Sequence, residues 1–203
     1  MQITCITPAD GQGKRQIYID DELFAALPSD VVMSLDLHTG DELNEQQAED
    51  LIVRVESLRA LQKAYDYLSY NALSRKKLGE KLIRADFSGD AVERALERLE
   101  QLGLVDDKAL GERLVSVMQH SKHWGYRRAR EELYKRGIAG ETADEVLSEY
   151  DSMPALYWQL EHKYRKYDLS DIAVRKKVMA GLVRLGFSFD EIRSALRDFE
   201  DEE

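Results

Sequence analysis

The stretch HWGYRRAREELYKRGI, from His123 to Ile138, decides the fold of this chain. Ala129, Leu133 and, past a turn, Ile138 follow one another at helical spacing and give the stretch one apolar side. Gly137 stands where a helix ends with a residue in the left-handed conformation, which glycine adopts without strain. The sequence therefore predicts a short amphipathic helix with a basic outer face and a glycine stop.

The same pattern occurs three times along the chain. Leu82, Leu133 and Leu182 occupy equivalent positions, which lie 51 and 49 residues apart. Six apolar columns stay in register without further gaps: Leu78/Ala129/Val178, Leu82/Leu133/Leu182, Phe87/Ile138/Phe187, Val92/Ala143/Ile192, Leu96/Leu147/Leu196 and Leu99/Tyr150/Phe199. Gly137 aligns with Gly186, although the first copy has Asp86 there. A unit of about 50 residues has room for three helices, so tandem three-helix repeats are expected.

We expect these repeats at residues 57–105, 106–151 and 152–203. Their first helices should span 57–70, 107–122 and 152–166, with Trp158 in the core. Ser188 and Glu191 form a capping-box pattern before the last helix. No linker rich in proline, glycine or serine separates the copies, so stacked modules are favoured over tethered ones.

Residues 1–56 are expected to form a small α+β cap. QITCI and QIYID alternate at period two and predict strands around a turn that contains GQGK. DDELFAAL and SDVVMSL are interpreted as short helices with Asp21 and Ser29 as N-caps. A longer helix should follow from Asn44, with a break near Ser57.

Composition limits the class of protein. Residues 1–56 hold three basic and twelve acidic side chains, a formal charge of −9, whereas residues 57–203 hold 26 basic and 27 acidic ones, a charge of −1. The net charge of −10 argues against a nucleic-acid partner, but its concentration in the first quarter weakens that objection. A single cysteine excludes an internal disulfide, and no apolar run approaches the length of a membrane span. We expect a cytoplasmic monomer with no membrane segment.

Basic residues repeat together with the apolar columns. A pair precedes the first column in every copy: Lys76 and Lys77, Arg127 and Arg128, Lys176 and Lys177. Further cations accompany these pairs: Arg75, Lys81, Arg84, Arg130, Lys135, Arg136, Arg175 and Arg184. The pairs are expected in the first turn of their helices, where the macrodipole disfavours cations by roughly a few tenths of a kcal/mol.

A solvated helix face would explain any one of these clusters. Three copies of a mildly unfavourable placement instead indicate a partner with a repeating anionic surface, either a phosphate backbone or a protein polymer. Trp124 and Tyr126, beside the central pair, are the candidate aromatic anchor.

No catalytic or cofactor site is predicted. His120 and His123 lie three residues apart but lack a third ligand at helical spacing, so a surface pair is expected rather than a metal site. GQGK lacks the spacing and the Ser/Thr of a phosphate-binding loop. No serine, histidine and carboxylate set can be assigned from spacing. We therefore expect neither an enzyme nor a bound cofactor.

Three stretches resemble the RecX family of bacterial recombination regulators: ALSRKKLGEKL from Ala72, LEQLGLVDDKALGERLV from Leu99 and GYRRAREELYKRGI from Gly125. The resemblance covers residues 60–150 and extends through the third repeat to about residue 199. Ala129 and Leu110 depart from it, because bulkier residues are common at these positions in the family.

The resemblance implies a mainly α protein of tandem three-helix repeats that form an elongated curved array. Members of the family bind the RecA filament along its helical groove, limit its extension and repress its ATPase, strand-exchange and co-protease activities. This chain would then regulate DNA repair and the SOS response. Under this leading hypothesis the chain docks through its repeated basic faces, with Arg127 and Arg128 as the central contacts. The candidate partner-binding residues are Lys76, Lys77, Lys81, Trp124, Tyr126, Arg127, Arg128, Arg130, Lys135, Arg136, Arg175, Lys176 and Lys177.

Two alternatives stay open. A direct DNA-binding module would use the same cations on phosphates and would show a steep salt dependence. A scaffold of helical repeats would bind another protein. Under the leading hypothesis, DNA is bound at most weakly.

Overall fold

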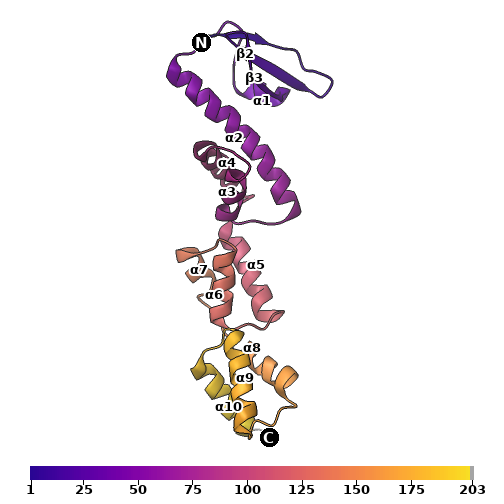
Figure 1. Ribbon diagram of the computed structural model, residues 1–203, viewed down its shortest axis with the longest axis vertical. Coiled ribbons are helices and arrows are strands. Elements are labelled where there is room, and N and C mark those ends of the chain that lie inside the picture. Colours follow the sequence, from indigo (N-terminus) through magenta and orange to yellow (C-terminus); the bar gives the residue numbers. More distant parts are fainter. Residues whose placement is uncertain (202–203) are drawn as a thin grey trace. The chain divides into compact units, whose positions relative to one another are not determined.

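The computed structural model describes residues 1–201 and the side chains of residues 1–198 (Figure 1). The Phe199 side chain, a member of the sixth apolar column, lies outside the described residues. The chain divides into two compact units. Residues 1–71 and 78–102 form the first, and residues 72–77 with the chain from Gly103 onward form the second.

The first unit begins with a three-stranded antiparallel sheet in the order β1-β2-β3, made of β1 (Ile3–Ile6), β2 (Lys14–Ile19) and β3 (Glu22–Pro28). Helix α1 (Ser29–Ser34) follows β3 and lies against the sheet in Figure 1. The core buries Ile3, Ile17, Ala25, Leu27, Val32 and Leu35 together with Leu51 and Val55 of helix α2 (Glu45–Tyr70). The predicted α+β cap is confirmed as a mixed unit.

The helix predicted from DDELFAAL is wrong, because residues 22–28 are strand β3. Asp20 and Asp21 have φ values of 49° and 67° and form the two-residue loop between β2 and β3. Positive φ at both loop residues matches the twist of a hairpin, and aspartate tolerates that conformation. Ser29 is likewise no N-cap: it is the first residue of α1, and its hydroxyl donates a hydrogen bond to the Gly13 carbonyl at 3.0 Å.

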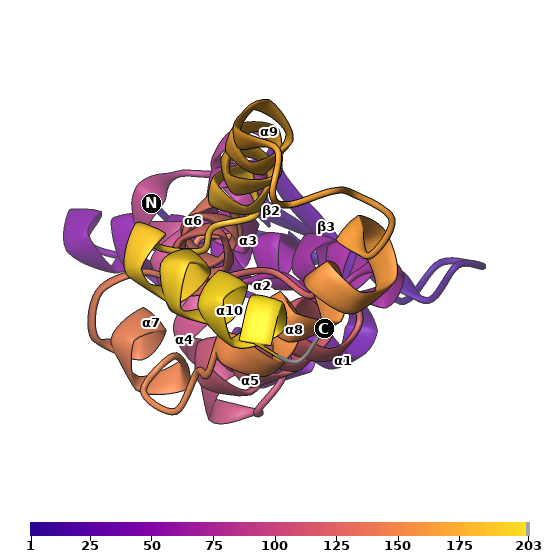
Figure 2. The ribbon, with the colours of Figure 1, turned by 90° about the horizontal axis from the view of Figure 1, so that it is seen from below.

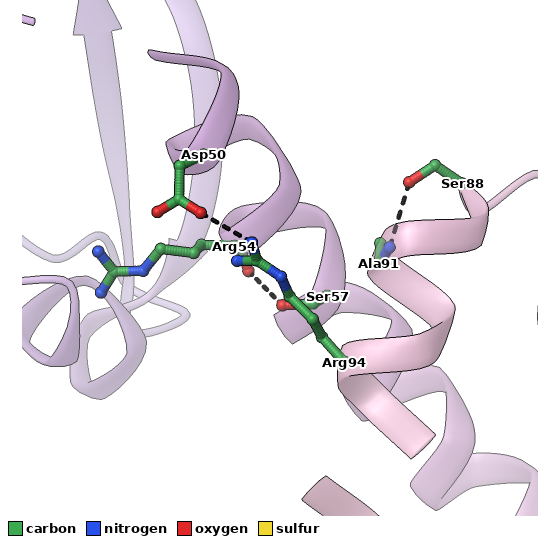
Figure 3. A network of polar contacts seen from close by, with 6 residues as sticks. All are labelled: Asp50, Arg54, Ser57, Ser88, Ala91 and Arg94. Atoms are coloured by element: carbon green, nitrogen blue, oxygen red, sulfur yellow. Dashed lines mark hydrogen bonds and ion pairs between the residues drawn. The ribbon is translucent and has the colours of Figure 1, made fainter. Parts of the chain in front are cut away.

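Helix α2 runs without the break expected near Ser57. Asn44 and Gln47 form a capping box at its start, and the Ser57 hydroxyl donates to the Arg54 carbonyl at 2.8 Å within the helix (Figure 3). The predicted boundary between residues 56 and 57 therefore falls inside one helix.

Helices α3 (Arg75–Ile83) and α4 (Gly89–Gln101) follow α2. Asp50 of α2 and Arg94 of α4 form an ion pair at 2.8 Å, and the Ser88 hydroxyl accepts a hydrogen bond from the Ala91 N–H at the start of α4 (Figure 3). Leu78, Leu82, Val92, Leu96 and Leu99, all from the predicted columns, are buried.

The second unit contains two more sets of three helices. The first set is α5 (Asp107–His120), α6 (Tyr126–Lys135) and α7 (Gly140–Val146). The second set is α8 (Met153–Gln159), which continues into the π-helical turn η1 (Leu160–Tyr164), then α9 (Ile172–Arg184) and α10 (Phe189–Asp201). Figure 2 looks onto this second set. Ala129, Leu133, Ile138, Ala143 and Leu147 are buried in one core, and Val178, Leu182, Phe187, Ile192 and Leu196 in another.

The predicted glycine stops and the capping box before the last helix are present. Gly137 and Gly186 have φ values of +86° and +94° after α6 and α9, and Asp86 takes φ 63° after α3. Before α10, the Ser188 N–H donates to the Glu191 carboxylate at 2.6 Å, and the Glu191 N–H donates to the Ser188 hydroxyl at 3.2 Å. Three tandem three-helix units with a small α+β cap are thus confirmed as the fold. Among residues 1–201, no helix is both long and apolar enough to cross a membrane.

Candidate partner-binding surface

The basic stretch that begins α6 packs directly against the end of α9. The Gly125 N–H donates to the Leu185 carbonyl at 2.8 Å, and the Arg127 N–H donates to the Gly186 carbonyl at 3.1 Å. A Cβ on Gly186 would lie 2.4 Å from the Arg128 nitrogen, and a Cβ on Gly125 would lie equally close to the Gly186 backbone. Only glycine permits this approach, because real Cβ contacts do not come so near. We call this contact, Gly125–Arg128 against Arg184–Gly186, the second joint.

A matching contact occurs one repeat earlier within the same unit. The Ser74 hydroxyl donates to the Arg136 carbonyl at 2.6 Å, and it would lie 2.5 Å from a Cβ on Gly137. The Arg75 N–H donates to the Asp107 carboxylate at 2.7 Å. We call this contact, residues 72–77 against Arg136 and Gly137, the first joint.

The joints give the first-turn cations an internal role. At the second joint, N–H groups that open α6 meet carbonyl groups that close α9, so the positive end of one helix dipole faces the negative end of another. The Arg128 guanidinium donates to the Arg184 carbonyl at 3.2 Å and lies 4.2 Å from the centre of the Trp124 ring. A cation beside these carbonyls is favoured rather than disfavoured. The expected electrostatic penalty therefore does not by itself require a partner.

The third basic pair lies in a different place from the other two. Asp171 caps α9, accepting a hydrogen bond from the Ala173 N–H at 2.7 Å, and the helix begins at Ile172. Lys176 and Lys177 consequently lie in the second turn of α9, as does Arg175 in front of them. The prediction that all three pairs occupy a first turn is wrong for this repeat, because α9 starts about one turn earlier than α3 and α6.

Several predicted partner-binding side chains have contacts of their own. Arg130 pairs with Asp144 at 2.9 Å and Arg136 with Glu132 at 3.0 Å. The Lys76 ammonium lies 5.6 Å from the centre of the Tyr134 ring, and in the first unit the Lys81 ammonium lies 5.0 Å from that of Tyr67. Exposed pairs of this kind contribute at most about 1 kcal/mol and exchange readily with a partner's charges.

Four of the cations predicted to bind a partner are exposed and form no side-chain hydrogen bond or ion pair within the described residues: Arg127, Lys135, Lys176 and Lys177. Arg127 and Lys135 belong to α6, and the two lysines belong to α9. These four side chains are available to an anionic partner.

Trp124 and Tyr126 belong partly to the core of the second repeat. Both are half-buried against its apolar cluster. The Tyr150 hydroxyl donates to the Trp124 carbonyl at 2.7 Å, and its ring meets Tyr126 edge-on at 6.2 Å. Burial raises the pKa of Tyr150 to about 12. The candidate aromatic anchor therefore also has a structural function.

An aromatic stack lies beside the second joint. The rings of His123 and Trp158 are 3.8 Å apart, and those of Trp158 and His162 are 4.6 Å apart, all nearly parallel. Trp158 is 38% exposed, so its predicted place in the core is wrong. Burial, followed by the nearby His162 and His120, lowers the pKa of His123. Within residues 1–201, no group of three His, Cys, Asp or Glu side chains is arranged to hold a metal ion.

Sequence reasoning missed the polar residues that build the joints. The three buried polar side chains among residues 1–198 are Ser74, Ser152 and Gln159, and each lies at or beside a joint. The Ser152 hydroxyl accepts from the Tyr126 N–H at 3.0 Å, and the Gln159 amide donates to the His123 carbonyl at 3.2 Å. Ser74 directly precedes α3 and Ser152 directly precedes α8, and this position was the available signal, because serine is a preferred N-cap.

Comparison with known proteins gives a consistent result. Models of the first, second and third three-helix domains of RecX match residues 60–99, 106–147 and 155–196. A protein called Regulatory protein RecX from Clostridioides difficile is 29% identical over 89% of this chain and 86% of its own length. The protein of the same name from Prosthecochloris aestuarii is 33% identical over 68% of this chain and 91% of its own length.

A solved structure shares the fold. The crystal structure of a regulatory protein RecX superposes with a TM-score of 0.70 at 25% identity, covering 95% of this chain and 98% of the other.

Proposed function

Because the chain belongs to the RecX family of regulatory proteins, we propose that it binds the RecA–DNA filament and represses the ATPase, strand-exchange and co-protease activities of RecA. In this role it is a regulator rather than an enzyme. Modulation of RecA would connect it to DNA repair and the SOS response in the cytoplasm.

Exposed cations on two successive repeats support the proposal at the level of residues. Arg127 and Lys135 on α6, and Lys176 and Lys177 on α9, are exposed cations on successive repeats of one compact unit. A polymer offers the same anionic group at intervals, so that contacts on successive repeats can be made to successive protomers. Linked weak contacts then produce a strong total affinity.

The test is the ATPase activity of RecA on single-stranded DNA, titrated with the wild-type protein and with Arg127→Glu. Arg127 is preferred to Arg128, because Arg128 supports the second joint and its loss would confuse binding with folding. We expect the variant to need about fivefold more protein for half-maximal repression, since one exposed charge pair is worth about 1 kcal/mol. Arg193→Glu on α10 is the matched charge reversal outside the clusters and should act as wild type.

Equal repression by wild type and Arg127→Glu would exclude this residue from the interface. Unchanged ATPase activity at saturating wild-type protein would refute the proposed repression itself.

Direct DNA binding is the second candidate, because the same exposed cations could contact phosphates. It predicts that the logarithm of the association constant for single-stranded DNA falls linearly with the logarithm of salt concentration, with a slope of about −0.7 per phosphate contact. The net charge of −10 is only a weak argument against this alternative, because residues 1–56 carry −9 of it. Measurable repression of RecA together with a flat, weak DNA-binding curve would exclude it.

A further inference from the structure

An open pocket of about 430 Å³ lies beside the first joint, and the residues Ala72 and Leu73 belong to both. Its apolar lining comes from Ala72 and Leu73 before α3, from Leu104 in the loop after α4, and from Ala109 and Leu110 on α5. Gly103, Asp106 and, on α5, Glu112 and Arg113 complete the lining. All of these residues belong to the second unit.

The internal repeat identifies the equivalent place at the second joint. Ala72 corresponds to His123, 51 residues further on, as Leu82 corresponds to Leu133. The first helices α5 and α8 align 46 residues apart, because Leu110, Leu114 and Met118 then meet the core positions Leu156, Leu160 and Tyr164. In that register Glu112 corresponds to Trp158.

The two joints differ in what fills this place. At the second joint the Trp158 ring lies on the His123 ring, with centres 3.8 Å apart and planes 11° apart. At the first joint Ala72 stands in the place of His123, and Glu112 stands in the place of Trp158. Both residues line the pocket. The chain thus shows, in its own second joint, that an aromatic ring fits against this part of a joint.

We propose that the pocket at the first joint receives an aromatic side chain, tyrosine or tryptophan, from the protein that this chain regulates. Leu73, Ala109 and Leu110 offer apolar contact to the faces of a ring. The Glu112 carboxylate can accept a hydrogen bond from an indole N–H or a phenol O–H. The Arg113 side chain, whose Nε donates to the Ala109 carbonyl at 3.3 Å, places its guanidinium at the pocket, where it can lie over a ring.

The charges at the pocket favour a protein ring over a nucleobase. Asp106 and Glu112 are two carboxylates against the single cation Arg113. A nucleotide would bring its phosphate close to these carboxylates, whereas a tyrosine or tryptophan side chain has no negative charge. Repulsion between the phosphate and these carboxylates would disfavour nucleotide binding.

The first experiment probes the pocket directly by NMR on the full chain. N-acetyltryptophanamide should shift the methyl signals of Ala72, Leu73, Leu104 and Leu110, and N-acetylleucinamide and dAMP should shift them several-fold less at equal concentration. Shifts of equal size with the leucine probe would overturn the preference for a ring. Larger shifts with dAMP would overturn the choice of a protein side chain, and no shift with any probe would overturn the pocket as a receptor.

The second experiment fills the pocket from within. Ala72→His with Glu112→Trp copies the residues of the second joint and should abolish the methyl shifts while the circular dichroism and the melting temperature stay near those of wild type. Ala72→Ser with Glu112→Gln is the matched control, because it alters the same positions and leaves the pocket open. Should the filled variant fail to fold, Ala109→Leu, which narrows the pocket at one position, replaces it.

The partner assignment rests on the proposed function and is tested with RecA filaments on single-stranded DNA. We expect the filled variant to bind at least about tenfold more weakly than wild type and the open control to bind within about twofold, since a buried aromatic anchor is a typical hot spot. Equal binding by the filled variant would overturn the pocket's part in the interface. Failure of the wild type to bind would refute the proposed function instead, and the NMR titration would still decide whether the pocket accepts a ring.

Discussion

Gly186 shows how a single residue can determine the contact between two repeats. It combines φ +94° with an approach that would leave a Cβ 2.4 Å from the Arg128 nitrogen. The equivalent residue of the first repeat is Asp86, which has a similar φ of 63°. The sequence alignment of Gly137, Gly186 and Asp86 could show that all three end a helix. It could not show that two of them must also accept the start of another helix.

We predict that Gly186→Ala lowers the free energy of unfolding by about 2–4 kcal/mol, because left-handed strain and a steric overlap both act. Urea denaturation measures this loss. Gly103→Ala separates the two causes, since Gly103 has φ +67° but open space around its Cβ position, and it should cost only about 1 kcal/mol. Gly89→Ala, with neither feature, should change stability by less than about 0.5 kcal/mol. Equal losses for Gly186→Ala and Gly103→Ala would contradict the close-contact argument.

His123 predicts how stability depends on pH. Burial, with His162 and His120 nearby, lowers its pKa from the ordinary value of 6.5. The unfolded chain therefore binds this proton more readily, so the free energy of unfolding should decrease as the pH falls through 6.5 and level off below the folded-state pKa.

His123→Asn tests this linkage, because asparagine does not titrate and tolerates the φ of 50° at this position. The quantity to compare is the slope of stability against pH between pH 5 and 7, roughly the range over which histidine titrates. We expect a shallower slope in the variant. An identical slope would mean that groups other than His123 produce the pH dependence.

At the scale of helices and strands, periodicity predicted most of what is buried. Leu82, Leu133 and Leu182 are each fully buried, as their shared column indicated. Residues 20–27 were misassigned because alanine, leucine and glutamate favour a helix, while pairing with β2 and a two-aspartate loop impose a strand. Tertiary contacts override the local helix propensity here, and a single sequence does not show those contacts.

The joints were missed for a related reason. Their hydrogen bonds link residues such as Ser74 and Arg136, which are 62 positions apart, and no periodic pattern marks such pairs. Arg127 and Arg128 are adjacent and chemically identical, so the sequence could not assign them different functions. In the structure, Arg128 contacts Trp124 and Arg184, while Arg127 has an exposed side chain.

This difference predicts that two neighbouring substitutions affect different properties, one the stability of the fold and the other the binding of the filament. Arg128→Ala removes a hydrogen bond and a cation–π contact at the second joint and should reduce the free energy of unfolding by about 1–2 kcal/mol. Arg127→Ala should change it by less than about 0.5 kcal/mol and should instead weaken filament binding. Chemical denaturation and filament affinity, measured for both variants, check the two parts. Equal stability losses would show that both arginines support the joint.

For the molecule as a whole, the distribution of charge matters more than its sum. The excess of acidic groups lies in residues 1–56, and the repeats carry nearly balanced charge with exposed cations on α6 and α9. If successive repeats contact successive protomers of a polymer, each cluster contributes a separate part of the binding free energy. Contacts that share no neighbour should then add.

Charge reversal on two repeats tests this additivity. We predict that Arg127→Glu on α6 and Lys176→Glu on α9 each weaken binding to the RecA filament about fivefold, and that the double variant weakens it about 25-fold, since independent free energies sum and affinity ratios multiply. Fluorescence anisotropy of labelled protein on pre-formed filaments measures all four affinities, with Arg193→Glu as the control reversal on α10. A double variant no weaker than the poorer single variant would show that the filament contacts one cluster at a time, and the explanation by linked contacts on successive repeats would have to be abandoned.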